Sequence, residues 1–352
     1  MRNNKFFTAL KTNQGMLITL LIFVLLPFVI GLFNGASPMQ VWMNENGQSK
    51  FLQGLAIEIF ILALYALSYD LIFGFTGLLS FGHSMFFAVG AYLTGILLKN
   101  FGLSLGVTFG LIFLAGIVQA LLFGMVLPRV KGITFALVTL GMASVFHVLV
   151  ISTELGEYTG SDVGLQGVIV PEWISPAGER LRLYFITLTI LALVFMIYKR
   201  FVNSPTGRVC TAIRENEARA QMLGYNTFYF KLAALMLSSL TAALAGGLHT
   251  IYQPIVSPNV AGLGYTVTAL LIILIGGVGT LNGALVGAIV FRLLDYGLRK
   301  YMGESASFIN GAVYVAIVLF LPYGIVGTWR LKSANLQQGW DRLLRMFNTR
   351  QK

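Results

Sequence analysis

The distribution of apolar residues constrains this chain more than any other feature. Of its 352 residues, 57% are hydrophobic and only 11% are charged, whereas a soluble domain usually carries about 25% charged residues. Many apolar runs reach the roughly 20 residues that cross the hydrocarbon core of a bilayer as a helix. The alternating pattern of a membrane barrel is absent, so we expect helices. The runs lie near residues 16–33, 52–72, 78–98, 103–127, 133–152, 181–198, 232–252, 262–278, 280–298 and 307–326.

The sequence therefore predicts an all-α polytopic membrane protein with about ten transmembrane helices. The first run follows basic residues and resembles a signal peptide, but no convincing cleavage site follows it, so we expect a retained helix. Two of the last four segments could be re-entrant instead of spanning. Residues 1–330 would form the transmembrane domain and residues 331–352 a basic amphipathic tail. That tail suits a helix on anionic membrane lipid, with a disordered tail as the alternative; its apolar residues at helical spacing are Trp340, Leu343, Leu344 and Phe347.

The charged residues predict an orientation. The net charge of +11 comes from a few short basic segments, which indicates membrane topology and not nucleic-acid binding. The positive-inside rule places them in the cytoplasm, so both termini would be cytoplasmic, together with residues 128–132 and the loop 199–231. The acidic loop 153–180 then faces outside, as do residues 34–51 and 253–261. Arg299 and Lys300 do not fit this topology, because it places them in an outer loop.

A charged, helix-forming segment, residues 207–224, lies between long apolar runs. Pro205 and Thr206 can start a helix and Gly224 can end it. Its apolar residues recur at near-helical spacing and predict one buried stripe, made of Val209, Ile213, Ala220 and Leu223. A membrane subunit that must bind a soluble motor needs such an insert, so we expect a docking helix that moves with the spans on either side. A solvated connecting helix is the alternative.

Two glycine-rich segments, residues 70–95 and 276–288, predict interrupted helices. Interruptions expose backbone N–H and C=O groups that can line a solute path at mid-membrane, although small residues also let helices pack closely. The candidate pathway or hinge residues are Gly74, Gly77, Ser80, Gly82, His83, Gly276, Gly277, Gly279 and Gly283.

Three acidic residues in or near apolar runs, Glu58, Asp70 and Asp295, would be costly in lipid. We expect them in local ion pairs or at the interface, with a proton relay as the alternative. Cys210 is the only cysteine and the three histidines lack ligand spacing, so no metal site is expected. The sequence contains no Walker ATP motif, no H-E-x-x-H and no G-x-S-x-G. We therefore expect no enzymatic activity and no cofactor bound by this chain.

Several motifs together resemble LivM-type permeases, the membrane subunits of ATP-driven importers for branched-chain amino acids and related solutes. Residues 207–224 are similar to the family's cytoplasmic coupling segment, residues 74–83 to its N-terminal signature and residues 276–288 to its C-terminal glycine signature. The match covers roughly residues 55–330, although Ala284 stands where the family often has proline. The resemblance implies ATPase-coupling roles for Arg208, Ile213, Arg214, Glu215, Asn216, Glu217, Ala220 and Gly224.

The resemblance also implies partners and a location. This chain would lie in the bacterial inner membrane and share its solute pathway with a second, LivH-like permease. Two cytoplasmic ATPase subunits would hold ATP and Mg²⁺, and an external solute-binding protein would deliver the small-molecule solute. A branched-chain amino acid is the expected solute, with urea, short amides or aromatic carboxylates as alternatives. An ion-coupled secondary transporter acting alone, using Asp70, Glu58 and His83, is a different reading, and a membrane enzyme is a more distant one.

Overall fold

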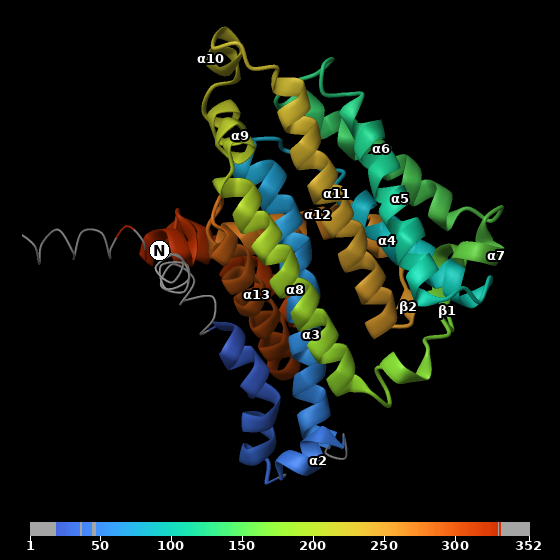
Figure 1. The fold of residues 1–352 in the computed structure, drawn as a ribbon. Helices are drawn as coiled ribbons and strands as arrows, with labels where there is room; N and C mark the ends of the chain where they lie inside the picture. Colours follow the sequence, from blue (N-terminus) through green and yellow to red (C-terminus); the bar gives the residue numbers. More distant parts are fainter. Residues whose placement is uncertain (1–18, 36, 44–46, 330, 332–352) are drawn as a thin grey trace, which may run out of the picture.

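The computed structural model describes residues 19–35, 37–43, 47–329 and 331. The predicted tail helix, with its apolar residues 340–347, lies outside the described residues. The described chain is all-α except for one pair of two-residue strands (Figure 1). After the helix Thr19–Phe33, the elements are α2 (Pro38–Trp42), α3 (Gly47–Asp70), the π-helical turn η1 (Leu71–Phe75), α4 (Ser84–Lys99), α5 (Leu105–Gly124), α6 (Ile133–Ile151), α7 (Gly156–Thr159), η2 (Ser161–Val163), β1 (Leu165–Gln166), η3 (Glu172–Ile174), α8 (Arg180–Asn203), α9 (Pro205–Glu215), α10 (Glu217–Met222), α11 (Thr227–Tyr252), β2 (Ile255–Val256), η4 (Pro258–Ala261), α12 (Leu263–Gly276), α13 (Leu281–Met302), η5 (Gly303–Ser305) and α14 (Ala306–Phe320).

Each of the ten expected apolar runs contains an apolar helix. Seven helices among the described residues are long and apolar enough to cross a membrane, which makes this a multi-pass membrane protein. The three shorter apolar helices are Thr19–Phe33, Ser84–Lys99 and Leu263–Gly276. These three helices correspond to the expected runs 16–33, 78–98 and 262–278. Of the ten expected runs, seven therefore form helices long enough to span a membrane, and three form shorter apolar helices.

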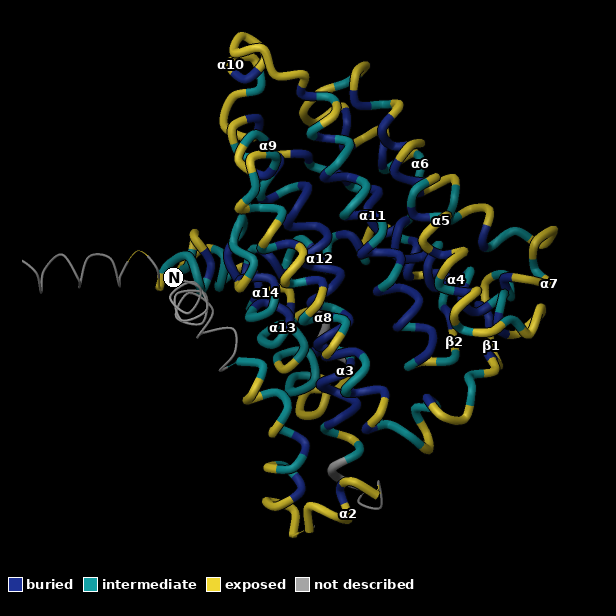
Figure 2. Tube along the Cα trace, in the orientation of Figure 1, coloured by how far each residue is buried: buried dark blue, intermediate teal, exposed yellow. Residues whose placement is uncertain are grey.

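The core is built around α3. In the span Lys50–Phe75, 89% of the residues in its apolar 18-residue stretch are buried inside the protein, whereas the same share is 28% in α5 and in α6. The central helix packs against α8, α11, α12 and α13, while α4, α5 and α11 pack against one another (Figures 1 and 2). The outer helices keep one apolar face exposed, as on α5 at Val107, Leu111, Leu114, Val118 and Leu121. An apolar face that is open to the surroundings over about four turns is what a bilayer accommodates.

The loops expected on the outer side meet at one end of the molecule. The strand β1 pairs antiparallel with β2, which joins the loop 153–180 to residues 253–261. Arg180 donates from Nη1 to the carbonyl oxygen of Lys50 at 3.0 Å, which adds the start of α3 to the same end. The helices α9 and α10 project from the opposite end (Figure 1). This separation agrees with the expected division of loops between two sides.

Two sequence expectations are corrected. Arg299 and Lys300 are not in a loop, because they form the last turn of α13. The segment 207–224 is not one helix: it is broken at Asn216, whose backbone is extended at φ −160° and ψ 101°. The Asn216 side chain accepts a hydrogen bond from the Arg219 N–H at 2.9 Å, so it caps the second helix as asparagine favourably does. We call α9, α10 and the turn that follows them, residues 205–226, the coupling hairpin.

Candidate functional site

The coupling hairpin is fastened to α11 by a partly buried ion pair. Lys231 Nζ lies 2.5 Å from Glu217 Oε1, and their side chains are only 7% and 22% exposed. Thr227 Oγ1 donates to the same carboxylate oxygen at 2.9 Å. Burial alone would raise the pKa of Glu217, but the hydrogen bonds from Lys231 and Thr227 outweigh it and lower the pKa. Glu217 therefore stays ionised at neutral pH and holds α10 against the start of α11.

The first helix of the hairpin packs its own apolar face inward. Gly207, Cys210 and Ile213 are buried on α9, and the Cys210 thiol donates to the Phe230 carbonyl oxygen at 3.6 Å. Burial raises the pKa of the Cys210 thiol to about 11. Ala220 on α10 is also buried, as the predicted stripe requires. Leu223 is 72% exposed, contrary to that prediction, because the break at Asn216 changes the direction of the chain between the two helices.

The side chain of Arg214 reaches from α9 to the first glycine-rich break. Arg214 Nη1 donates to the carbonyl oxygen of Gly74, across 140 residues of sequence. That carbonyl belongs to the π-helical turn η1 that interrupts the central helix. A Cβ at Gly77, whose φ is +77°, would lie 3.0 Å from Arg214 Cα, so the loop needs glycine both for its backbone angle and for this contact. Arg214 thus contacts the first half of the interruption at two places, Gly74 and Gly77.

Asp70 joins the second glycine-rich break to the first. Its Oδ1 accepts a hydrogen bond from the Gly279 N–H at 2.7 Å, across 209 residues of sequence. The Asp70 carboxylate is fully buried and interacts electrostatically with Arg214. Gly279 has φ +71°, and a Cβ there would lie 2.8 Å from Arg214 Nη1. The Asp70 side chain therefore lies inside the protein at the junction of the two breaks.

The three predicted segments, 207–224, 70–95 and 276–288, therefore meet at one place. Helix breaks leave backbone groups without helical partners, and in an apolar medium each such group must be satisfied. Arg214 satisfies the Gly74 carbonyl and Asp70 satisfies the Gly279 amide. We call these four residues the anchor. The anchor joins the coupling hairpin to the first break and the first break to the second.

The remaining candidate pathway residues are distributed around the breaks and do not form one surface. His83 Nε2 lies 2.8 Å from Ser68 Oγ, and its ring stacks on Tyr65 at 5.3 Å between centroids. Ser80 is buried with no hydrogen-bond partner for Oγ among the described residues. Gly82 is buried where its backbone approaches the Thr139 carbonyl. The glycines at the second break, Gly276, Gly277 and Gly283, are packed against one another's backbone.

The far end of the coupling hairpin is exposed and partly apolar. Met222 is 85% exposed and Leu223 is 72% exposed, and Tyr225, which follows them, is 45% exposed. Figure 2 shows the end of the molecule around α10 as mostly exposed. Two large apolar side chains are therefore exposed at the tip of this projecting segment. Arg208, Glu215 and Asn216 are also exposed on the hairpin. The sequence analysis did not single out Met222, and it assigned Leu223 to the buried face. The signal that could have indicated a break was Asn216, a good helix cap, which stands between apolar residues of the predicted stripe.

The other two acidic residues in apolar runs form ion pairs. Arg292 bonds Glu58 and also donates from Nη1 to Asp295 Oδ2 at 2.9 Å. Arg299 Nε donates to Asp295 Oδ1 at 2.8 Å. The expectation of local ion pairs is confirmed for Glu58 and Asp295. Among the described residues, no group of three or more histidine, cysteine, aspartate or glutamate side chains is placed to hold a metal ion.

Comparisons with known proteins agree with this architecture. Residues 51–322 match the family model described as branched-chain amino acid transport system / permease component. The high-affinity branched-chain amino acid transport system permease protein LivM of Escherichia coli (strain K12) is 25% identical over 77% of this chain and 69% of its own length. LivH of the same organism is 25% identical over 75% of this chain and 91% of its own length. The probable LivM of Methanocaldococcus jannaschii is 24% identical, over 75% of this chain and 89% of its own length.

No solved structure matches the chain significantly. The family match extends from the start of α3 to the end of α14 and so includes the anchor, the coupling hairpin and the ion pairs. The chain belongs to the branched-chain amino acid transport system permease component family, as a membrane subunit without catalytic activity of its own.

Proposed function

We propose that this chain is the LivM-like permease subunit of an ATP-driven importer in a bacterial inner membrane, and that its solute is a branched-chain amino acid. It forms the solute pathway with a second, LivH-like permease. Two cytoplasmic ATPase subunits hydrolyse ATP with Mg²⁺, an external binding protein delivers the solute, and this chain binds no cofactor. Both termini, the coupling hairpin and the basic loops face the cytoplasm, and the loop 153–180 faces outside.

The observation that carries this proposal is the construction of the coupling hairpin. Its tip exposes Met222 and Leu223, which suits docking into a groove of a soluble subunit. Its base is fastened to α11 through Glu217 and to the first helix break through Arg214, and Asp70 joins that break to the second. A solvated connecting loop needs neither an apolar tip nor a charged side chain bonded to a helix break. The arrangement suits a lever between a motor and the membrane domain.

The lever acts in the following way. Closure of the ATPase dimer displaces the tip, and α9 and α10 move together because Ile213 and Ala220 are packed inward. Arg214 transmits the displacement to the Gly74 carbonyl, and Asp70 transmits it to the loop between α12 and α13. The helices on either side of each break, including those that carry His83 and Gly283, then change their packing and switch access to the pathway.

The test is a mild-detergent purification of tagged chain from native membranes, with partners identified by mass spectrometry. We expect a P-loop ATPase and a second permease to co-purify with the wild-type chain. Met222→Asp with Leu223→Asp should release the ATPase and retain the second permease, because the substitutions place two charges in the docking surface. Val163→Asp with Ile169→Asp is the matched control, since those side chains are 71% and 68% exposed on the outer loop.

Two results would refute the proposal. One is full ATPase recovery with the charged tip; the other is a wild-type chain that comes back alone from several gentle detergents. A chain without partners that transports solute on an ion gradient, indifferent to ATP, would support a secondary transporter instead. Urea or short amides remain the alternative solutes for the importer, and uptake of labelled leucine against labelled urea by the purified complex distinguishes them.

A further inference from the structure

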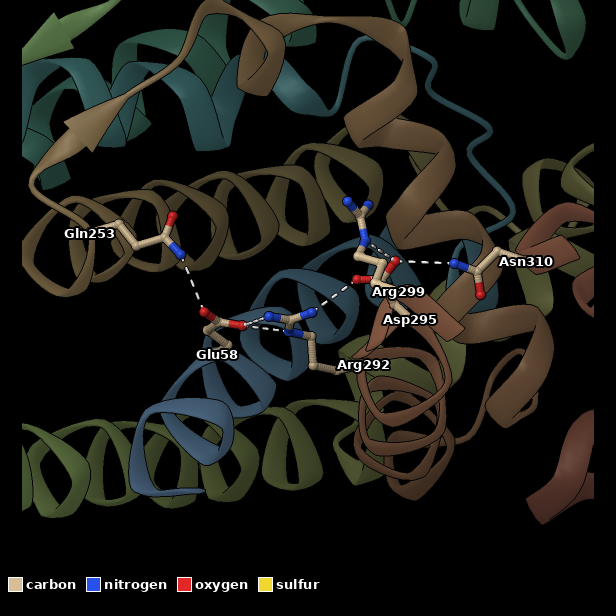
Figure 3. A network of polar contacts seen from close by, with 6 residues as sticks. All are labelled: Glu58, Gln253, Arg292, Asp295, Arg299 and Asn310. Atoms are coloured by element: carbon tan, nitrogen blue, oxygen red, sulfur yellow. Dashed lines mark hydrogen bonds and ion pairs between the residues drawn. The ribbon is translucent and has the colours of Figure 1, made fainter. Parts of the chain in front are cut away.

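A network of charged side chains joins four helices near the end of the molecule opposite the coupling hairpin. Figure 3 shows Glu58 on α3, Gln253 at the end of α11, three residues on α13 and Asn310 on α14. Glu58 Oε2 is bound by the Arg292 guanidinium, and Glu58 Oε1 accepts from Gln253 Nε2 at 3.2 Å. Asp295 accepts from Arg292 Nη1 at 2.9 Å and from Arg299 Nε at 2.8 Å. Two acidic and two basic side chains thus alternate along one connected row.

The location of the Glu58–Arg292 pair is unusual for a structural ion pair. Both residues lie near the middle of helices long enough to span a membrane. Their side chains are partly exposed, Glu58 by 16% and Arg292 by 24%. Charges in a spanning helix cannot face lipid without a large penalty, so the exposed side of the pair must face water or another protein. A solute reaches the pair only from that exposed side.

The hydrogen bonds around the pair allow it to open. Arg292 keeps Asp295 as a partner when it leaves Glu58, and Glu58 keeps Gln253. Neither charge is then left without any partner, which is the usual reason why a partly buried ion pair does not break. The opened pair presents a guanidinium fork and a carboxylate, the two groups that bind carboxylates and ammonium ions most directly.

Two tyrosine side chains lie close to the carboxylate. Glu58 interacts electrostatically with Tyr252 and Tyr265. The Tyr265 ring packs on Tyr65 at 5.2 Å and on Phe87 at 4.6 Å between centroids. Tyr65 and Phe87 are fully buried, so these two rings fix the position of Tyr265 beside the charged pair and are not themselves exposed to a solute.

We propose that the Glu58–Arg292 pair is a contact site for the zwitterionic head group of an α-amino acid passing through this subunit. This inference rests on the proposed importer function and names the solute class that the membrane subunit itself selects. The solute carboxylate takes the place of Glu58 on Arg292, and its ammonium takes the place of Arg292 on Glu58. Only a zwitterion replaces both charges of the opened pair and also leaves the total charge of the row unchanged: a neutral amide keeps the total charge but leaves the opened pair uncompensated, and an anion or cation leaves one charge in excess.

The test uses the complete importer in proteoliposomes, with uptake of labelled leucine as the readout. In the double variant Glu58→Gln with Arg292→Gln, both charges are removed and both side chains remain polar. We expect the KM for leucine uptake to rise about tenfold or more, because charge-assisted hydrogen bonds to the head group are lost. ATPase stimulation by the solute-binding protein should be retained. Glu179→Gln with Arg182→Gln is the matched control, an exposed pair at 3.1 Å that should leave the KM unchanged.

A second measurement does not depend on transport. Gln253→Cys places a thiol beside Glu58 at an exposed position, and the native Cys210 is buried. In the complex without its binding protein, leucine should slow labelling of this cysteine by a membrane-impermeant maleimide, whereas isovaleramide should not. Equal protection by isovaleramide, no protection by leucine, or a wild-type KM in the neutral double variant would each overturn the inference while leaving the importer function intact. A wild-type complex that takes up no leucine with ATP would refute the importer function, and the inference with it.

Discussion

Replacing Arg214 by glutamine tests the anchor directly. The substitution removes the charged donor to the Gly74 carbonyl and the opposite charge beside the fully buried Asp70. A hydrogen bond that involves a charged group contributes about 1.5–3 kcal/mol. Because Arg214 is exposed as a residue, the smaller value applies. A coupling free energy reduced by this amount lowers the effect of one site on another about tenfold.

The assay measures solute uptake and phosphate release together in proteoliposomes that contain the full importer. We expect Arg214→Gln to keep the assembly and the ATPase rate and to lower the solute transported per ATP about tenfold. Arg129→Gln is the matched control, because Arg129 also donates to a carbonyl oxygen, that of Met125 at 2.8 Å, but only within its own turn. Arg214→Lys should recover part of the coupling, since the charge is restored without the planar fork.

The same experiment contains its refutation. If Arg214→Gln transports as many solute molecules per ATP as the wild type, the hydrogen bond to Gly74 transmits nothing and the lever must act through packing alone. If the variant loses its ATPase subunits, Arg214 contributes to docking instead of transmission.

Three further predictions concern the coupling hairpin. Glu217→Gln should increase proteolysis within residues 216–226, because it leaves the buried Lys231 charge unpaired and so loosens α10. Adding Lys231→Met should reverse this increase. Unchanged cleavage in Glu217→Gln would contradict the role of the ion pair. Because the Glu217 pKa is lowered on folding, its stabilisation is complete above the ordinary glutamate pKa and is lost only as the pH falls through the lower folded value. Protease resistance of the hairpin should thus be flat from neutral pH to about pH 5 and fall in stronger acid, and a loss already near pH 6 would oppose this assignment. The Cys210 thiol, buried and with its pKa raised to about 11, should react slowly with maleimide in the intact complex and faster in Glu217→Gln; fast labelling of the wild type would contradict the packing of α9.

Part of the candidate site could be predicted from sequence because its determinants are local. Ile213 and Ala220 are buried as their spacing indicates, and glycine clustering predicted breaks that the structure places at 71–83 and 277–280. The capping role of Asn216 is also local, but helix propensity across residues 207–224 concealed it. Leu223 was misplaced for that reason, since a helical wheel drawn through a break gives the wrong face.

The anchor could not be predicted, because its partners are remote in the sequence. Asp70 and Gly279 are 209 residues apart, and Arg214 and Gly74 are 140 residues apart. A single sequence does not indicate which of the three acidic residues in apolar runs accepts the hydrogen bond from the Gly279 N–H. The same holds for Glu58 and Arg292, 234 residues apart, where sequence indicated only that a charge in a span needs a partner.

The sequence by itself determined that this chain is a helical membrane protein with a charged insert, because hydropathy and helix-forming tendency act over one or a few turns. It also determined the family, through motifs in a fixed order. Only the tertiary structure decided that the insert is a broken hairpin, that Arg214 and Asp70 bind two helix breaks together, and that Glu58 meets Arg292. The physical reason is that unsatisfied backbone groups and charges in an apolar interior take whichever partner the packing of the helices brings within reach.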